Sequence, residues 1–190
     1  GAGSAWVALA ERMGRRDFAM LFEDAINYAR DGYLASPITA RAWARAEGRY
    51  EGLSSFAETF LPKGRAPRPG ELFRNPDQAE TLVEIAETKG ESFYRGQLAE
   101  RIAAHARETG GLLTEEDLAA HQPEWVTPLK EGYRGYHLHE IPPNGQGLAA
   151  LIAVGILDHF DLSKYPVDSA DTIHLQVEAM KLAFAETSRH

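Results

Sequence analysis

The sequence predicts an α+β protein that is mainly helical, with one β-hairpin in its last third. Apolar residues recur at helical spacing through most of residues 1–120. Residues 125–141 are instead rich in aromatic and β-branched side chains and alternate near their end. Helical spacing returns after residue 148. We therefore divide the 190 residues into a helical part, 1–120, and a second part, 121–190, that contains the hairpin and two helices.

Glycines and N-cap residues delimit the first predicted helices. Two runs of apolar residues at helical spacing end at Gly14 and at Gly32, and glycine is the residue that most often follows a helix. Ser36 precedes Pro37, the favoured pair of an N-cap followed by a first-turn proline. This pair predicts a third helix that runs to about Gly48.

The remainder of the helical part contains a loop and three further helices. Residues 62–74 hold three prolines and two glycines and are predicted to form a surface loop. Asn75 begins the next helix, and Gly90 ends it. A further helix is predicted from residue 97 to about 109, and a capping threonine begins a short helix over residues 114–118.

The predicted hairpin and the last two helices make up the second part. We expect strands at about 125–130 and 133–141, joined by a turn at Lys130, Glu131 and Gly132. The apolar run at 148–157 predicts a buried helix. An Asp-Ser pair at 168–169 then begins an amphipathic helix.

Composition excludes several classes of function. The net charge is −8 with both signs interspersed, whereas a nucleic-acid-binding surface needs a basic stripe. The sequence has no cysteine, which excludes disulfides, thiol catalysis and cysteine-ligated zinc. No apolar stretch approaches the ~20 residues of a membrane helix. We expect neither a nucleic-acid nor a membrane partner, and composition leaves the compartment open between cytoplasmic and periplasmic or secreted.

The stretch "IPPNGQG", residues 141–147, has two interpretations. Backbone N–H groups at the start of a helix can bind an anion such as a carboxylate. Asn-Gly and proline also mark a simple turn between a strand and a helix. The dinucleotide-binding fingerprint is incomplete, because Ala150 stands at its third glycine and no acidic residue follows at the expected distance. Asn144 and Gln146 are the side chains of this loop that we select as candidates for contact with a ligand.

Two histidines form the other candidate constellation. His137 and His139 would lie on one face of a strand, a spacing that can bind zinc. A third ligand is not obvious, although His121 and Glu124 are possible, so we predict no metal site and no cofactor. The sequence also lacks a Gly-x-Ser-x-Gly elbow and a phosphate-binding loop. We assign no catalytic residue to this chain.

Four motifs are specific in combination: "RNPD" at 74–77, "FYRG" at 93–96, "GGLLT" at 110–114, and "YRGY" at 133–136 before the prolines at 142 and 143. In this order, and over nearly the whole chain, they resemble the large subunit of the gamma-glutamyltranspeptidases (gamma-glutamyltransferases). The resemblance implies that residues 1–190 are one internal fragment of that subunit.

The resemblance implies a fold and a mechanism. The family's members are N-terminal-nucleophile hydrolases with an αββα core, and their precursor cleaves itself to expose a threonine at the start of the small subunit. That threonine attacks a gamma-glutamyl amide with its own amine as the base, and the acyl group passes to water or to an amino acid or peptide. The threonine and most substrate contacts would lie after this chain, and the arginine that holds the α-carboxylate before it. The partners implied are the small subunit of the same precursor and a small gamma-glutamyl substrate, and the fragment alone would be inactive.

One departure from the family pattern bears on the substrate. Many members have Pro-Pro-Pro-Ser-Ser-Gly-Gly where this chain has Pro-Pro-Asn-Gly-Gln-Gly at 142–147. Glutathione, other gamma-glutamyl amides and acylase substrates therefore all stay open. A helical module that binds a partner or a small acid is the alternative from another functional class. As a fragment, the chain would leave the hairpin edges unpaired and an apolar stripe exposed on helix 172–189, so we expect it to self-associate.

Overall fold

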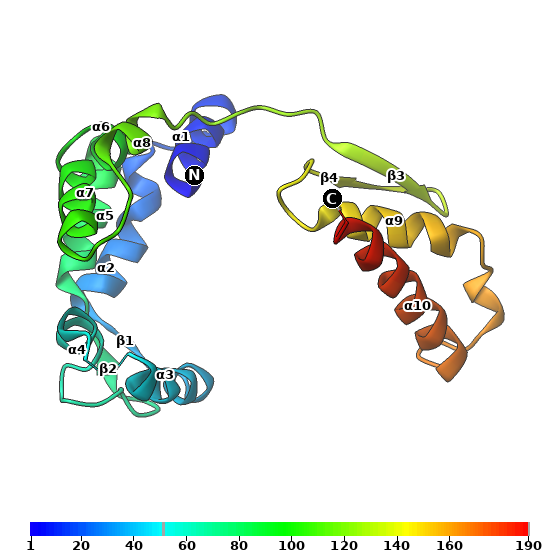
Figure 1. Ribbon diagram of the computed structural model, residues 1–190, viewed down its shortest axis with the longest axis horizontal. Coiled ribbons are helices and arrows are strands. Elements are labelled where there is room, and N and C mark those ends of the chain that lie inside the picture. The colour runs from blue at the N-terminus through cyan, green and yellow to red at the C-terminus, as the bar shows by residue number, and fades with distance from the viewer. Residues whose placement is uncertain (51, 190) are drawn as a thin grey trace. The chain divides into compact units, whose positions relative to one another are not determined.

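The computed structural model describes residues 1–50 and 52–189 and divides the chain into two compact units, Gly1–Pro123 and Glu124–His190. Both contain mostly helix, and each has one two-stranded antiparallel ladder (Figure 1). The mainly helical α+β class expected from the sequence is confirmed. Across the described ranges, no helix combines the length and the apolar character needed to cross a membrane.

Unit 1 is built almost entirely from helices (Figure 1). In chain order its elements are α1 (Ala2–Met13), η1 (Ala19–Phe22), α2 (Glu23–Asp31), β1 (Tyr33–Leu34), α3 (Pro37–Arg49), α4 (Ser54–Phe60), β2 (Leu72–Phe73), α5 (Pro76–Glu87), α6 (Glu91–Arg95), α7 (Gln97–Glu108) and α8 (Glu115–Ala120). The predicted helix ends at Gly14 and Gly32 are confirmed, because these glycines follow α1 and α2 directly.

The N-caps read from the sequence are confirmed in unit 1. The Ser36 side chain accepts a hydrogen bond from the backbone N–H of Thr39, and the Asn75 side chain accepts one from Gln78. Thr114 forms a capping box with Asp117 at the start of α8. Each cap satisfies a backbone N–H that the helix itself leaves without a partner, which explains why these helices begin where they do.

The core of unit 1 lies where η1, α5 and α7 meet. Phe18 and Phe22 pack edge to face, with ring centroids 5.0 Å apart, against Ile85, Ala86 and Leu98. Partly buried side chains from α1, α2 and α5 cover this cluster. The buried apolar area gives the unit its main stabilising term.

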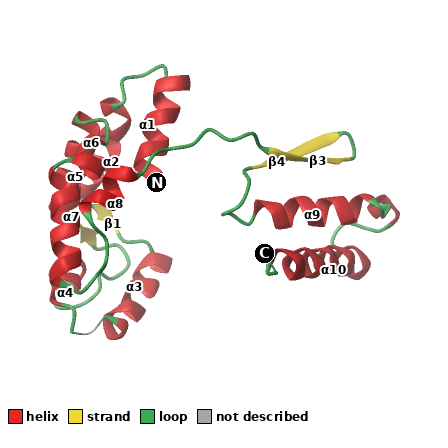
Figure 2. Cartoon of the chain, turned by 45° about the horizontal axis from the view of Figure 1, so that its top comes forward, coloured by secondary structure: helices red, strands yellow, loops and turns green. Residues whose placement is uncertain are grey.

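Unit 2 places helix α9 between the hairpin and helix α10 (Figure 2). Its elements are β3 (Leu129–Tyr133), β4 (Tyr136–Glu140), α9 (Gly147–Asp158), η2 (Leu162–Lys164) and α10 (Ala170–Thr187). The core is small: alanines of α9 and α10 approach closely, and half-buried isoleucine, leucine and methionine side chains surround them. Ser169 caps α10 by accepting a hydrogen bond from Thr172, as the sequence predicts.

The predicted position of the hairpin turn is wrong. Tyr133 pairs with Tyr136, so the turn is Arg134-Gly135 rather than residues 130–132. Both turn residues have positive φ, 48° and 86°, the backbone that suits a two-residue turn between twisted strands. Residues 125–128, predicted as strand, lie outside β3 and form no secondary structure. The strong β-propensity of Trp125 and Val126 is not realised, because no neighbouring strand in the described chain pairs with them.

The short elements α4, α6, η2, β1 and β2 were not predicted. Helices α4 and α6 have seven and five residues, too few for a periodic pattern to identify them. Strand β2 lies inside the predicted loop 62–74 and pairs with β1, some forty residues earlier in the chain. Gly32 makes this pairing possible, since a Cβ there would lie 2.7 Å from the Phe73 carbonyl oxygen.

Candidate functional site

The loop between β4 and α9 carries the two side chains selected from the sequence. Asn144 and Gln146 are both exposed. Gln146 is the N-cap residue of α9, yet its side chain makes no capping bond; its backbone carbonyl accepts a hydrogen bond of 3.0 Å from Ala149. The loop thus presents two polar side chains to solvent at the start of an apolar helix.

A carboxylate from β4 lies against the start of that helix. A Cβ placed on Gly147 would be 2.5 Å from Oε2 of Glu140 and 2.8 Å from its Cβ. The N-terminus of a helix favours negative charge, and Glu140 supplies one from within the chain. An anionic ligand would meet this carboxylate, so the geometry favours the interpretation of residues 141–147 as a turn over that of an anion-binding nest.

The two histidines of the hairpin lie on one exposed face, as predicted. The ring centroids of His137 and His139 are 6.4 Å apart on β4. The candidate third ligand His121 belongs to unit 1, where its ring contacts Ser4 and Tyr94. In the described ranges, no group of three or more His, Asp or Glu side chains is arranged to hold a metal ion.

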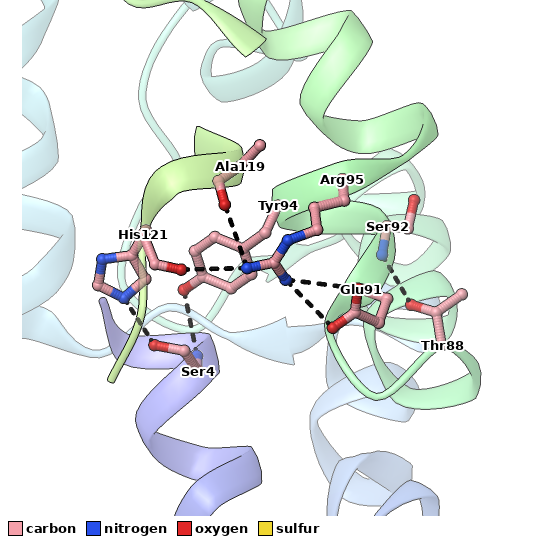
Figure 3. Close-up of polar contacts among 8 residues, drawn as sticks. All are labelled: Ser4, Thr88, Glu91, Ser92, Tyr94, Arg95, Ala119 and His121. Atoms are coloured by element: carbon pink, nitrogen blue, oxygen red, sulfur yellow. Dashed lines mark hydrogen bonds and ion pairs between the residues drawn. The ribbon is translucent and has the colours of Figure 1, made fainter. Parts of the chain in front are cut away.

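Unit 1 contains a polar cluster that the sequence did not reveal (Figure 3). The Nε2 atom of His121 lies 2.8 Å from Oγ of Ser4, and the two residues are 117 positions apart. The hydroxyl of Tyr94 accepts a hydrogen bond of 3.1 Å from the backbone N–H of Ser4, and the His121 ring stacks on Tyr94 with centroids 5.2 Å apart. No spacing signal could have predicted the Ser4–His121 pair, because only the packing of α1 beside the end of α8 creates it.

The Ser4–His121 pair lacks the features of a nucleophile and its base. The Ser4 Oγ lies 2.8 Å from both the Gly1 carbonyl oxygen and His121 Nε2, so the carbonyl competes with the ring for the hydroxyl hydrogen. A catalytic histidine must accept the serine proton and be oriented by a carboxylate. Among the described residues no carboxylate is bonded to the His121 ring, so nothing here orients the histidine as the triad requires.

The second unit also exposes an apolar surface on its last helix. On α10, Ile173, Val177 and Phe184 are each more than two-fifths exposed, which confirms the stripe expected from the sequence. On the same helix the Lys181 ammonium donates a hydrogen bond of 2.7 Å to Glu178, and this bond lowers the pKa of the Glu178 carboxyl.

The comparison with known proteins decides the family. The sequence pattern of the gamma-glutamyltranspeptidases matches residues 1–190. The chain belongs to this family. The resemblance inferred from the four motifs is thereby confirmed.

Members with related sequences and structures show how much of the family's length the chain represents. It is 36% identical over 184 residues to a glutathione hydrolase-like proenzyme, YwrD, of Bacillus subtilis, covering 95% of this chain and 34% of that protein. The crystal structure of cephalosporin acylase from Bacillus halodurans matches with a TM-score of 0.91 and 48% identity over 97% of this chain and 35% of that one. For the gamma-glutamyltranspeptidase of Helicobacter pylori the TM-score is 0.89 and the identity 30%, over 96% of this chain and 53% of that one. The chain thus spans about a third of the length of the curated relative.

Proposed function

We propose that residues 1–190 are part of the large subunit of an enzyme that cleaves gamma-glutamyl amides and transfers the acyl group to water or to an amine. The family match along the whole chain is the observation that carries this proposal. The nucleophile is a threonine outside this chain, at the N-terminus that self-cleavage of the precursor creates, and its free amine acts as the base. The partner of this chain is the small subunit of the same precursor; the B. subtilis relative is named as a proenzyme.

In the whole enzyme these residues contribute to an αββα N-terminal-nucleophile hydrolase fold. The hairpin β3–β4 supports this, because in the described chain each of its strands pairs only with the other. Unpaired strand edges readily accept a further strand. We therefore propose that β3 or β4 joins a larger sheet formed by the remainder of the polypeptide.

An acylase without gamma-glutamyl specificity is the second candidate function. Two observations favour it: the 48% identity to a cephalosporin acylase, and the departure of residues 142–147 from the Ser-Ser-Gly-Gly pattern of many family members. The two functions differ in whether the site requires the α-ammonium of a gamma-glutamyl group, and a glutaryl group is the same acyl chain without that ammonium.

The experiment that separates the candidates compares two donors on the full-length enzyme. Gamma-glutamyl-p-nitroanilide and glutaryl-p-nitroanilide release the same leaving group and differ only in the α-ammonium. A higher kcat/KM for the first supports the gamma-glutamyl enzyme, and a higher value for the second supports the acylase. Cleavage of neither donor would refute the gamma-glutamyl enzyme, and cleavage by residues 1–190 alone would refute both candidates, since both place the nucleophile outside this chain.

Asn144 and Gln146 are proposed as the contribution of this chain to substrate binding. Both are exposed amides with no hydrogen-bond partner for their side chains in the described structure. Replacing both by alanine in the full-length enzyme should raise KM while self-cleavage stays normal. Asn27→Ala, an exposed amide on α2, is the matched control. Unchanged kinetics in the double variant would remove these residues from the site.

A further inference from the structure

Helices α1, α6 and the end of α8 meet near residues 119–121, where the polypeptide leaves unit 1. One nitrogen of the Arg95 guanidinium, on α6, donates to the carbonyl of Ala119 at 3.1 Å and to that of His121 at 3.2 Å (Figure 3). The other terminal nitrogen lies 3.3 Å from a carboxylate oxygen of Glu91. The Ala119 carbonyl belongs to the last turn of α8, and His121 is the residue that follows this helix.

The ring of His121 contacts α6 and α1. It stacks on Tyr94, which is 5% exposed, with an interplanar angle of 19°. Its Nε2 bonds to Ser4 on α1. Thus the main chain at residues 119–121 is held by Arg95, and the side chain of His121 is held by Tyr94 and Ser4.

The polypeptide beyond this point has a different character. Residues 122–128 form no helix or strand and are all exposed. They lead to β3 and, through the hairpin, to the loop that carries Asn144 and Gln146. A fixed starting point would define where this segment leaves unit 1.

We propose that Arg95 and His121 form a clamp that fixes the exit of the chain from unit 1, with Arg95 as the positioning residue. A guanidinium suits this task because its planar fork can hold a carboxylate and main-chain carbonyls at the same time, and its charge is favourable beside the C-terminal carbonyls of a helix. The clamp is independent of the reaction proposed above. It confines the local opening of this part of the chain to the residues that follow His121.

Hydrogen exchange of the full-length enzyme tests the clamp. The reporter is the peptide that contains the His121 amide, which donates to the Leu118 carbonyl at 3.2 Å. Arg95→Lys keeps the positive charge but cannot span Glu91 and both carbonyls, and we expect exchange in residues 115–123 to become about tenfold faster. Exchange in α5, which the clamp does not touch, should stay unchanged.

Two control variants distinguish the clamp from general electrostatics. Arg107→Ala removes an ion pair of 3.9 Å to Glu115 at the other end of α8 and should leave the reporter unchanged. Glu91→Gln weakens the ion pair of Arg95 but keeps its carbonyl bonds, and it too should have little effect.

The outcomes are decisive in either direction. Faster exchange confined to residues 115–123 in Arg95→Lys, with both controls silent, supports the clamp. An unchanged rate in Arg95→Lys overturns it. An equal rise in α5 and in residues 115–123 also overturns it, since Arg95 would then stabilise the whole unit rather than the exit of its chain.

Discussion

Substitution of Gly147 by alanine tests how the start of α9 is packed. The new Cβ would lie 2.8 Å from Cβ and 2.9 Å from Cδ of Glu140. The carboxylate can swing away, but the Glu140 Cβ is fixed to the end of β4 and can move only with the strand. Overpacking of this kind destabilises by about 1–3 kcal/mol, and the better helix propensity of alanine offsets less than about 1 kcal/mol of it.

The expected net effect is a local loss of about 1–2 kcal/mol, which corresponds to roughly 5- to 30-fold faster amide exchange in α9. Hydrogen exchange of the full-length enzyme measures it. Gly145→Ala is the matched control, because a Cβ there would have no atom within 4 Å and the residue does not have positive φ. Its exchange rates should stay near those of the unmodified protein.

A double-mutant cycle with Glu140→Gly isolates the contact. Glu140→Gly removes the Cβ that obstructs the new methyl group, so the two changes together should cost less than the sum of the two alone. Contacting residues typically show coupling of about 0.5–3 kcal/mol. Additive effects, or equal effects of Gly145→Ala and Gly147→Ala, would refute the packing argument.

Three further predictions concern the core of unit 1, an acidic group and the exposed helix α10. Leu98→Ala in the core of unit 1 should lower the free energy of unfolding by about 2–5 kcal/mol in a denaturant titration, whereas Leu112→Ala, 92% exposed, should leave it unchanged. A hydrogen bond from Ser163 lowers the pKa of Asp161 in the folded protein below its value in the unfolded chain. The ionised Asp161 therefore stabilises the fold above the unfolded-state pKa, and this stabilisation is lost as the pH falls through the folded-state pKa. Asp161→Asn should remove this acid dependence of thermal unfolding. Residues 1–190 expressed alone should self-associate in sedimentation experiments, less so with Phe184→Glu, and a monodisperse monomer with an ordered α10 would contradict this.

Features set by neighbouring residues could be predicted from the sequence. The N-caps at Ser36, Thr114 and Ser169 each depend on a bond to a residue three positions later, and all three form in the structure. The helix ends at Gly14 and Gly32 depend on the glycine itself. Such local rules identified most helices of eight or more residues.

Features that depend on contacts between residues far apart in the sequence could not be predicted in this way. The choice between Gly132 and Gly135 for the hairpin turn depends on which register β3 and β4 adopt, and a single glycine signal does not distinguish them. The contacts of His121 with Ser4 and Tyr94 span 117 and 27 positions and follow no periodic pattern. The same limit applies to the candidate site, where the sequence selected Asn144 and Gln146 but gave no indication of Glu140.

The loop at 141–147 therefore combines a glycine that its packing requires with two exposed side chains that no described contact holds. The family pattern and this chain both end the loop on a glycine, and here Gly147 is the residue that the close approach of Glu140 requires. Asn144 and Gln146, which replace the more common serine and glycine, face solvent and contact neither Glu140 nor the core of unit 2 by any described bond. We therefore expect substitutions at these two positions to leave the start of α9 unchanged, whereas substitutions at Gly147 disturb it.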